Sequence, residues 1–292
     1  MSDTLLELHG VSKRFGQKLV LDGVDLSLPA GSIMGLVGKN GAGKSTLLKC
    51  ALGLQSPQSG EIRILGEPAA KLSAAGKERL GYVPQNIDLY PWMTIGQIVS
   101  YTGAFYRHWN ASLVARLIRD WELNPNDRVG VLSVGQTQKL AILLALGHEP
   151  DLLILDEPAA SLDPVSRRQF LEVLLDMVGE RTVLFSTHIT SDLERVADRV
   201  AVLKEGKIVY SSELDALQDS VKRLHVQAAA PFANGDFRVP GMLHAKVTGC
   251  EAVVCVQDFT EELPQQISRQ WSAAVTVQDL NLEDIFLELH HE

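Results

Sequence analysis

The most constraining feature of this 292-residue sequence is a glycine-rich turn between a predicted buried strand and a predicted helix. The turn, residues 38–45, reads Gly-Lys-Asn-Gly-Ala-Gly-Lys-Ser. An almost wholly apolar segment, 32–37, precedes it, and residues 45–52 have the pattern of a helix. Glycines let backbone N–H groups curl around phosphate oxygens, and the positive end of the following helix strengthens the attraction. We therefore expect a phosphate-binding loop that opens an α/β nucleotide-binding fold.

The side chains of this loop indicate separate roles toward a nucleotide. Lys44 is expected to reach the β- and γ-phosphates, and the Ser45 hydroxyl is expected to ligate Mg²⁺. The other residues expected to bind the nucleotide here are Gly38, Lys39, Asn40, Gly41, Ala42, Gly43 and Thr46.

A second apolar segment ends in two carboxylates. Residues 152–155 read Leu-Leu-Ile-Leu and are followed by Asp156 and Glu157. Such a segment is typical of a strand that is buried on both faces of a parallel sheet. We expect Asp156 to hold Mg²⁺, directly or through water, and Glu157 to orient or deprotonate an attacking water. With a phosphate loop upstream, this pattern predicts nucleotide hydrolysis.

A further glycine-containing helix start lies at residues 132–136, Leu-Ser-Val-Gly-Gln. Ser133 as a cap and the Gly135 amide would form a second phosphate-binding helix end, before a helix that begins near Thr137. One chain rarely needs two γ-phosphate sites for one nucleotide. We therefore expect this segment to reach the nucleotide of another subunit in a dimer. A plain helix cap and turn is the alternative interpretation.

Changes in pattern along the chain predict its domains. The first sixty residues alternate as strands and turns, and residues of about 86–140 are rich in helix formers and aromatics. Strand and helix patterns then alternate, which predicts a mainly parallel sheet that is covered on both faces. We expect a first domain over residues 1–220, with a helical insertion at about 86–140, and a small α+β domain over 221–292.

Composition excludes several classes of protein. The chain has 36 acidic and 27 basic residues, a formal net charge of −9, which disfavours wholesale binding of nucleic acid. The three cysteines (Cys50, Cys250 and Cys255) cannot all pair and lack metal-ligand spacing, as expected in a reducing compartment. No apolar run approaches the roughly 18 residues of a membrane span, and the first residues lack the basic start of a signal peptide. We expect a cytoplasmic protein that reaches a membrane only through a partner.

In their order, these motifs resemble the ATPase subunit of ATP-binding-cassette (ABC) transporters, over about residues 5–211. The resemblance implies that Phe15 stacks on adenine and that Gln85, in Tyr-Val-Pro-Gln, touches the metal and couples the subunits. It implies that His188 contacts the γ-phosphate and that residues 161–163 contact the other subunit of a dimer. The segment 132–136 corresponds to the family signature, with the nucleotide-contacting residues Ser133, Gly135 and Gln136.

Two positions depart from the pattern of the family. Phe15 replaces the usual Tyr, but it keeps the π face, so adenine stacking should survive. Val134 stands where a second Gly is common, and a β-branched residue narrows the backbone options there. We expect these departures to affect kinetic detail rather than activity.

The resemblance implies an α/β fold with a P-loop NTPase core, an N-terminal β subdomain and a helical insertion, plus the small α+β domain. It also implies ATP and Mg²⁺ as cofactors, dimerisation with an identical subunit or a sister ATPase, and a separate integral-membrane permease. Such a subunit lies on the cytoplasmic face of the cell membrane through its permease. The last seventy residues resemble the extension of drug, antibiotic and polysaccharide exporters, most clearly at 282–287, and favour export.

Other functions remain as alternatives. An importer ATPase shares the same motifs. Soluble ABC proteins that act on DNA or ribosomes carry coiled coils, zinc insertions or two cassettes, and this sequence has none of these features. A non-hydrolysing regulator is disfavoured because Lys44, Glu157 and His188 are all present. The aromatic segment 90–93 is either a socket for a partner helix or, at Trp92, part of the core.

Overall fold

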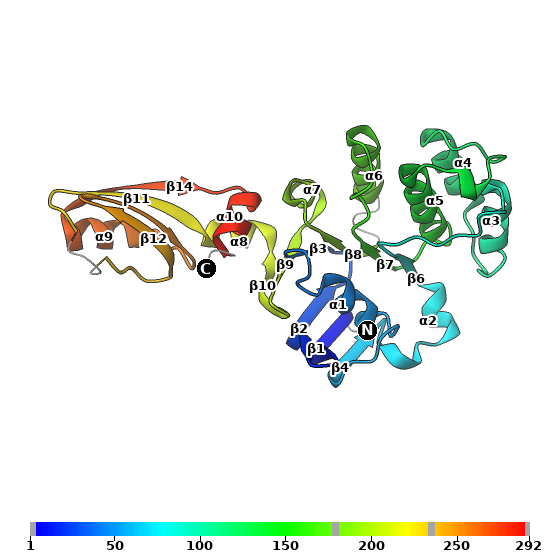
Figure 1. Cartoon of the computed structure of the whole chain (residues 1–292), viewed down its shortest axis with the longest axis horizontal. Coiled ribbons are helices and arrows are strands. Elements are labelled where there is room, and N and C mark those ends of the chain that lie inside the picture. The colour runs from blue at the N-terminus through cyan, green and yellow to red at the C-terminus, as the bar shows by residue number, and fades with distance from the viewer. Residues whose placement is uncertain (1–3, 177–180, 233–236, 290–292) are drawn as a thin grey trace. The chain divides into compact units, whose positions relative to one another are not determined.

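The computed structural model describes residues 4–176, 181–232 and 237–289 (Figure 1). The chain forms two compact units, Met1–Ser211 and Ser212–Glu292, so the division falls somewhat before the boundary at 220 expected from the sequence pattern. In the described part of the chain, no helix is long and apolar enough to cross a membrane. All three cysteines are free thiols.

A six-stranded sheet lies at the centre of the first unit. Its strand order is β10-β9-β3-β8-β7-β6. The pairs β9–β3, β3–β8, β8–β7 and β7–β6 are parallel. The strands are β3 (Ile33–Val37), β6 (Leu80–Val83), β7 (Leu152–Asp156), β8 (Thr182–Thr187), β9 (Arg199–Lys204) and β10 (Lys207–Glu213). Every residue of β3, β7 and β8 is buried, as expected for central strands covered on both faces. Because the carboxyl ends of parallel strands share one edge, the loops that follow these three strands meet there.

An antiparallel sheet forms the N-terminal β subdomain. Its order is β2-β1-β4-β5, with β1 (Thr4–Phe15), β2 (Lys18–Pro29), β4 (Ser59–Ile64) and β5 (Glu67–Pro68). The apolar face of this sheet shares one core with the parallel sheet, in which Leu28, Leu48 and Leu184 are fully buried. The loop after β3 is thereby fixed between two sheets.

In the described part of the first unit, these strands are connected by α-helices: α1 (Lys44–Ala51), α2 (Ala74–Glu78), α3 (Ile95–Gly103), α4 (Ala111–Asp120), α5 (Val134–Leu146), α6 (Pro164–Asp176) and α7 (Thr190–Val196). Short 3₁₀ turns lie at Ala69–Lys71 and Val129–Val131. Helices α3, α4 and α5 gather beyond the β6 edge of the parallel sheet (Figure 1). They make up the expected helical insertion. The apolar run 140–146 is buried within α5, which anchors the insertion to the core.

The second unit is a small α+β fold. Its antiparallel sheet has the order β12-β13-β11-β14, with β11 (Lys222–Ala228), β12 (Met242–Thr248), β13 (Glu251–Val256) and β14 (Ala273–Asp279). Its helices are α8 (Leu214–Ser220), α9 (Leu263–Trp271) and α10 (Leu282–Leu289). Helix α9 packs on one sheet face through Leu263 and Ile267. Glu288 of α10 is buried and lies 2.6 Å from the Arg223 guanidinium of β11, which ties α10 to the sheet.

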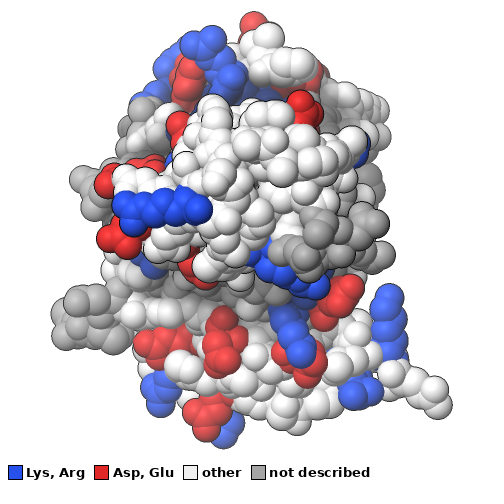
Figure 2. Space-filling model, turned by 90° about the vertical axis from the view of Figure 1, so that its left-hand side faces the viewer, with Lys and Arg blue, Asp and Glu red and all other residues white. Residues whose placement is uncertain are grey.

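Acidic and basic side chains are intermixed on the molecular face shown in Figure 2. They do not gather there into a broad patch of one sign. The described residues on this face therefore form no basic stripe of the kind that a nucleic-acid phosphate backbone attracts.

Candidate functional site

The loop between β3 and α1 requires glycine at the points where the backbone is most confined. A Cβ atom at Gly38 would lie 2.5 Å from the carbonyl oxygen of Leu203. Gly43, which caps α1, has a φ of 111°, where L side chains are strained. The loop thus turns tightly and leads directly into the positive end of α1.

This loop forms one wall of a cavity of about 520 Å³. The cavity collects residues that are far apart in the sequence: Phe15, Lys18, Val20, Asn40, Gly41, Gly43, Lys44, Ser45, Thr46, Gln85 and Glu157. Lys18 and Val20 also line the cavity, although the sequence did not predict them as binding residues. Their position shortly after Phe15 in the chain could have suggested this role. Phe15 is half exposed, at 49%, and Lys13 Nζ lies 5.3 Å from its ring centre.

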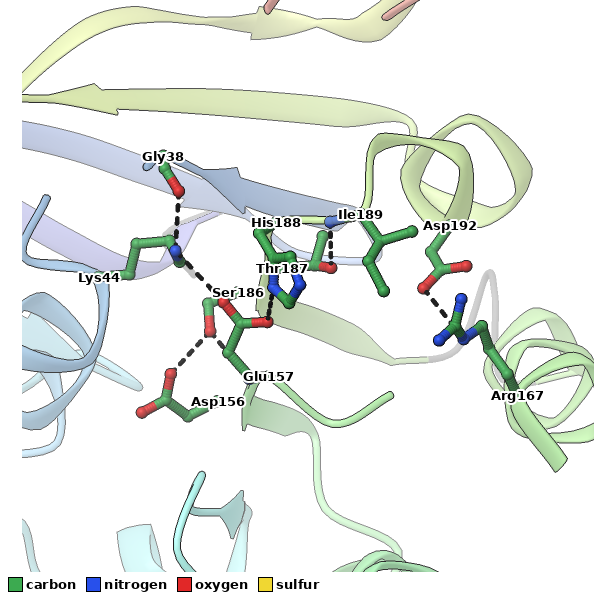
Figure 3. Close-up of polar contacts among 10 residues, drawn as sticks. All are labelled: Gly38, Lys44, Asp156, Glu157, Arg167, Ser186, Thr187, His188, Ile189 and Asp192. Carbon is green, nitrogen blue, oxygen red and sulfur yellow. Dashed lines mark hydrogen bonds and ion pairs between the residues drawn. The ribbon is translucent and has the colours of Figure 1, made fainter. Parts of the chain in front are cut away.

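Lys44 and Glu157 form a buried ion pair at the base of the site (Figure 3). The Lys44 Nζ atom lies 3.2 Å from Glu157 Oε1, and it donates a hydrogen bond to the carbonyl oxygen of Gly38 at 2.8 Å. Both side chains are less than a tenth exposed. Because opposite charges attract more strongly away from water, this pair fixes both functional groups in place.

Glu157 is held in an unusual backbone conformation. It is the first residue after β7 and has a φ of 52°, a left-handed value that costs a residue with a Cβ about 1 kcal/mol. Its backbone N–H donates to Ser186 Oγ at 3.0 Å, and Ser186 donates to Asp156 Oδ1 at 2.7 Å. Ser186 is completely buried on β8, beside Asp156 in the parallel pairing. This serine therefore orients both carboxylate residues, a role that the sequence analysis missed.

Asp156 has one carboxylate oxygen without a protein partner. Its Oδ2 atom is buried and has no hydrogen bond from the residues that the structure describes. Burial, with a smaller contribution from the Asp156 charge, raises the pKa of nearby Tyr82 to about 12. A buried and unpaired anionic oxygen is costly unless a cation balances it.

His188 follows the end of β8 and faces Glu157. Its Nδ1 atom lies 2.8 Å from Glu157 Oε2, while its side chain is 48% exposed (Figure 3). The next turn is fixed by a hydrogen bond from the Ile189 N–H to Thr187 Oγ1 at 2.9 Å. The parallel order β3-β8-β7 thus places Lys44, Glu157 and His188 in one chain of contacts.

The segment 132–136 is separate from this cavity. Ser133 caps α5 by accepting a hydrogen bond from the Gln136 N–H at 3.2 Å, and the Gln136 side chain accepts one from the Ser133 N–H at 2.9 Å. This capping box starts the helix at Val134, earlier than the expected start near Thr137. Among the described residues that line the cavity, none belongs to 132–136. Gly135 lies with Ser133 and Gln136 in this separate segment.

The sequence of this chain is similar to those of known proteins over nearly its whole length. The profile of a family described as ABC transporter matches residues 21–160. A Nod factor export ATP-binding protein of Burkholderia orbicola (strain AU 1054) is 34% identical to this chain, over 99% of the chain and 98% of the relative. This chain belongs to the ABC transporter family. It is an ATP-binding ATPase subunit, which pairs with a membrane component of the transporter.

Solved structures of ABC ATPases share the fold of the first unit. An ATP-binding subunit of an ABC transporter superposes with a TM-score of 0.68 and 30% identity, and covers 74% of this chain and 92% of its own. A dimeric bacterial ABC transporter cassette gives a TM-score of 0.65 at 25% identity, covering 72% of this chain and 99% of its own. These comparisons confirm the expected α/β fold and the ATPase function of this ABC subunit.

Proposed function

We propose that this ABC subunit dimerises around two ATP molecules and that ATP hydrolysis drives export through a separate membrane permease. One observation carries the dimer: the cavity holds Phe15, the phosphate loop, Gln85 and Glu157, but not the signature segment 132–136. If both sets contact one nucleotide, the second set comes from another subunit. A solved bacterial ABC transporter cassette of similar fold is dimeric, which supports a dimer here.

Each wall of the cavity then has a role toward ATP. The exposed ring of Phe15 stacks on adenine, and the loop amides with Lys44 hold the phosphates. A γ-phosphate competes with the Glu157 carboxylate for Lys44, which lies 3.2 Å from it. Nucleotide binding thereby frees Glu157 to act on water.

Hydrolysis uses Glu157 as the general base. A water molecule attacks the γ-phosphorus, its proton passes to the Glu157 carboxylate, and the bond from phosphorus to the ADP oxygen breaks. His188, 2.8 Å from Glu157 Oε2, keeps this carboxylate aligned and offers a donor to the γ-phosphate. Ser186 fixes the backbone of Glu157 by accepting a hydrogen bond from its N–H group.

The residues at the base of the cavity fit a magnesium ion. Asp156, which directly precedes the cavity residue Glu157, has a buried carboxylate oxygen without a partner among the described residues, and Ser45 and Gln85 line the cavity. Oxygen donors of this kind suit Mg²⁺, which when bound would neutralise the phosphate charge.

The shared site predicts a selective effect of Ser133→Arg. The large cation blocks the surface offered to the second subunit, but it leaves the cavity of its own chain intact. We expect the affinity of the monomer for ATP to change less than about twofold, within the range of surface substitutions. ATP-driven dimerisation and hydrolysis should both be lost. Calorimetry and light scattering with ATP measure these two properties.

A matched control for Ser133→Arg is Ser112→Arg, which places the same side chain on an exposed position of α4. This control should dimerise and hydrolyse ATP like the parent. Loss of ATP binding by monomeric Ser133→Arg would mean that the segment acts within its own chain, contrary to the proposal.

An exposed aromatic strip is the proposed docking site for the permease. It consists of Trp92, Tyr90, Tyr101 and Phe105, in this spatial order, and their successive ring centres lie 5.2, 5.7 and 5.1 Å apart. Trp92 is 65% exposed, so its alternative placement in the core is wrong. Exposed aromatics of this kind suit the apolar side of a cytoplasmic helix of a membrane protein. Such docking places the subunit on the cytoplasmic face of the membrane.

Export is favoured over import by the relatives, which are named as Nod factor export proteins and match the chain over both units. The genes beside this one test the direction. We expect a multi-span permease without a solute-binding protein. An adjacent solute-binding protein gene would favour the importer alternative.

A further inference from the structure

A second pair of opposite charges, with a buried aspartate and a partly exposed arginine, lies beside the catalytic residues. Asp192 on α7 is 4% exposed, and its Oδ2 atom lies 3.9 Å from the Arg167 Nε atom on α6 (Figure 3). Neither atom has a hydrogen-bond partner among the residues that the structure describes. The two opposite charges therefore face each other where water screens them weakly. The distance between the two atoms is somewhat longer than a hydrogen bond allows.

The two residues connect the loop before α6 with the segment after β8. Asp163, in the expected dimer-contact loop, accepts hydrogen bonds from the N–H groups of Val165 and Ser166 at 3.0 Å each and so fixes the start of α6. Arg167 lies one turn further, and its own N–H donates to the Asp163 carbonyl oxygen at 2.8 Å. These hydrogen bonds join the loop to the helix turn that carries Arg167.

On the other side, Asp192 lies in the first turn of α7, four residues after His188. Its N–H contacts the Ile189 carbonyl oxygen at 3.3 Å, so the turn that carries His188 is continuous with Asp192. Burial raises the pKa of Asp192, whereas Arg167, Arg195 and His188 oppose that rise. The carboxylate therefore lies within electrostatic reach of the catalytic histidine.

We propose that Arg167 and Asp192 are a positioning pair that couples the dimer-contact loop to His188, and so to Glu157. This inference rests on the proposed function. When the second subunit engages residues 161–163, α6 moves, the pair closes to a hydrogen bond, and α7 holds His188 against Glu157.

Asp192→Asn tests this coupling because it keeps the size of the side chain and removes its charge. We expect kcat to fall about tenfold, equivalent to losing about 1.4 kcal/mol of transition-state stabilisation. The KM for ATP should stay within about twofold, since the cavity is untouched. Arg167→Gln should give the same loss, and the double variant should be no worse than either single one. Arg167→Lys keeps the cation and should recover part of kcat.

Arg168→Gln is the matched control. Arg168 also pairs with a carboxylate, Glu172 at 3.0 Å, but on the exposed side of α6. We expect parent-like kcat from this control. A parent-like kcat in folded Asp192→Asn and Arg167→Gln would overturn the coupling, as would additive losses in the double variant. If Asp192→Asn does not fold, Arg167→Gln and Arg167→Lys decide the question, because Arg167 is less buried.

Failure of this inference is distinguishable from failure of the proposed function. If the proposed dimer fails, Ser133→Arg hydrolyses ATP like the parent. If only the coupling fails, Ser133→Arg is inactive while the variants at Arg167 and Asp192 turn over ATP normally.

Discussion

Glu157→Gln is expected to bind ATP normally and to hydrolyse it at least about a hundredfold more slowly, the scale of a lost general base. The amide has nearly the same shape, so Lys44 keeps its bond to the Gly38 carbonyl oxygen and the cavity keeps its walls. It cannot, however, accept the proton of the attacking water. ATP should therefore hold the variant as a stable dimer, which size-exclusion chromatography and a phosphate-release assay detect together.

The matched control for this variant is Glu172→Gln, which changes an exposed carboxylate on α6 that pairs only with Arg168 among the described residues. It should hydrolyse ATP at the parent rate. Near-parent turnover by Glu157→Gln would show that another group serves as the base.

Lys44→Ala is expected to lose both binding and hydrolysis. The ammonium makes charge-assisted hydrogen bonds to the β- and γ-phosphates, so its loss should weaken ATP affinity by at least about tenfold. Among the described residues, it also leaves the buried Glu157 carboxylate with His188 as its remaining ion-pair contact, which should lower the free energy of unfolding by about 3 kcal/mol. Calorimetry with ATP and urea denaturation measure the two effects.

Lys49→Ala is the control for Lys44→Ala, because it removes the same kind of charge from the opposite end of α1. We expect parent-like ATP affinity and only a small change in stability. Unchanged nucleotide affinity in folded Lys44→Ala would contradict the assignment of the phosphate loop.

The sequence predicts those parts of the site that are local in the chain. The phosphate loop and the acidic strand end depend on consecutive residues, and the apolar runs before Gly38 and Asp156 become the central strands β3 and β7. The sequence also predicts Ser133 as a helix cap, although the helix begins at Val134 rather than near Thr137. These features need no knowledge of the tertiary fold.

Contacts between strands could not be predicted in the same way. Ser186 reaches Asp156 and the Glu157 N–H because β7 and β8 are neighbours, although the residues are about thirty positions apart. The approach of Arg167 to Asp192 depends likewise on how α6 packs beside α7. Strand β11 was missed because its charged and polar residues hide the alternation of Leu224, Val226 and Ala228, which are buried at the centre of the second sheet.

The central claim is that each ATP lies between the phosphate loop of one subunit and the signature segment of the other. Its most direct test mixes two inactive variants, Ser133→Arg and Lys44→Ala, and measures ATP hydrolysis. A mixed dimer has one site with an intact Lys44 and an intact Ser133, and one site with neither. We predict that the mixture recovers part of the parent activity while each variant alone has none. An inactive mixture, with mixed dimers shown to form by differential tags, would contradict the shared site.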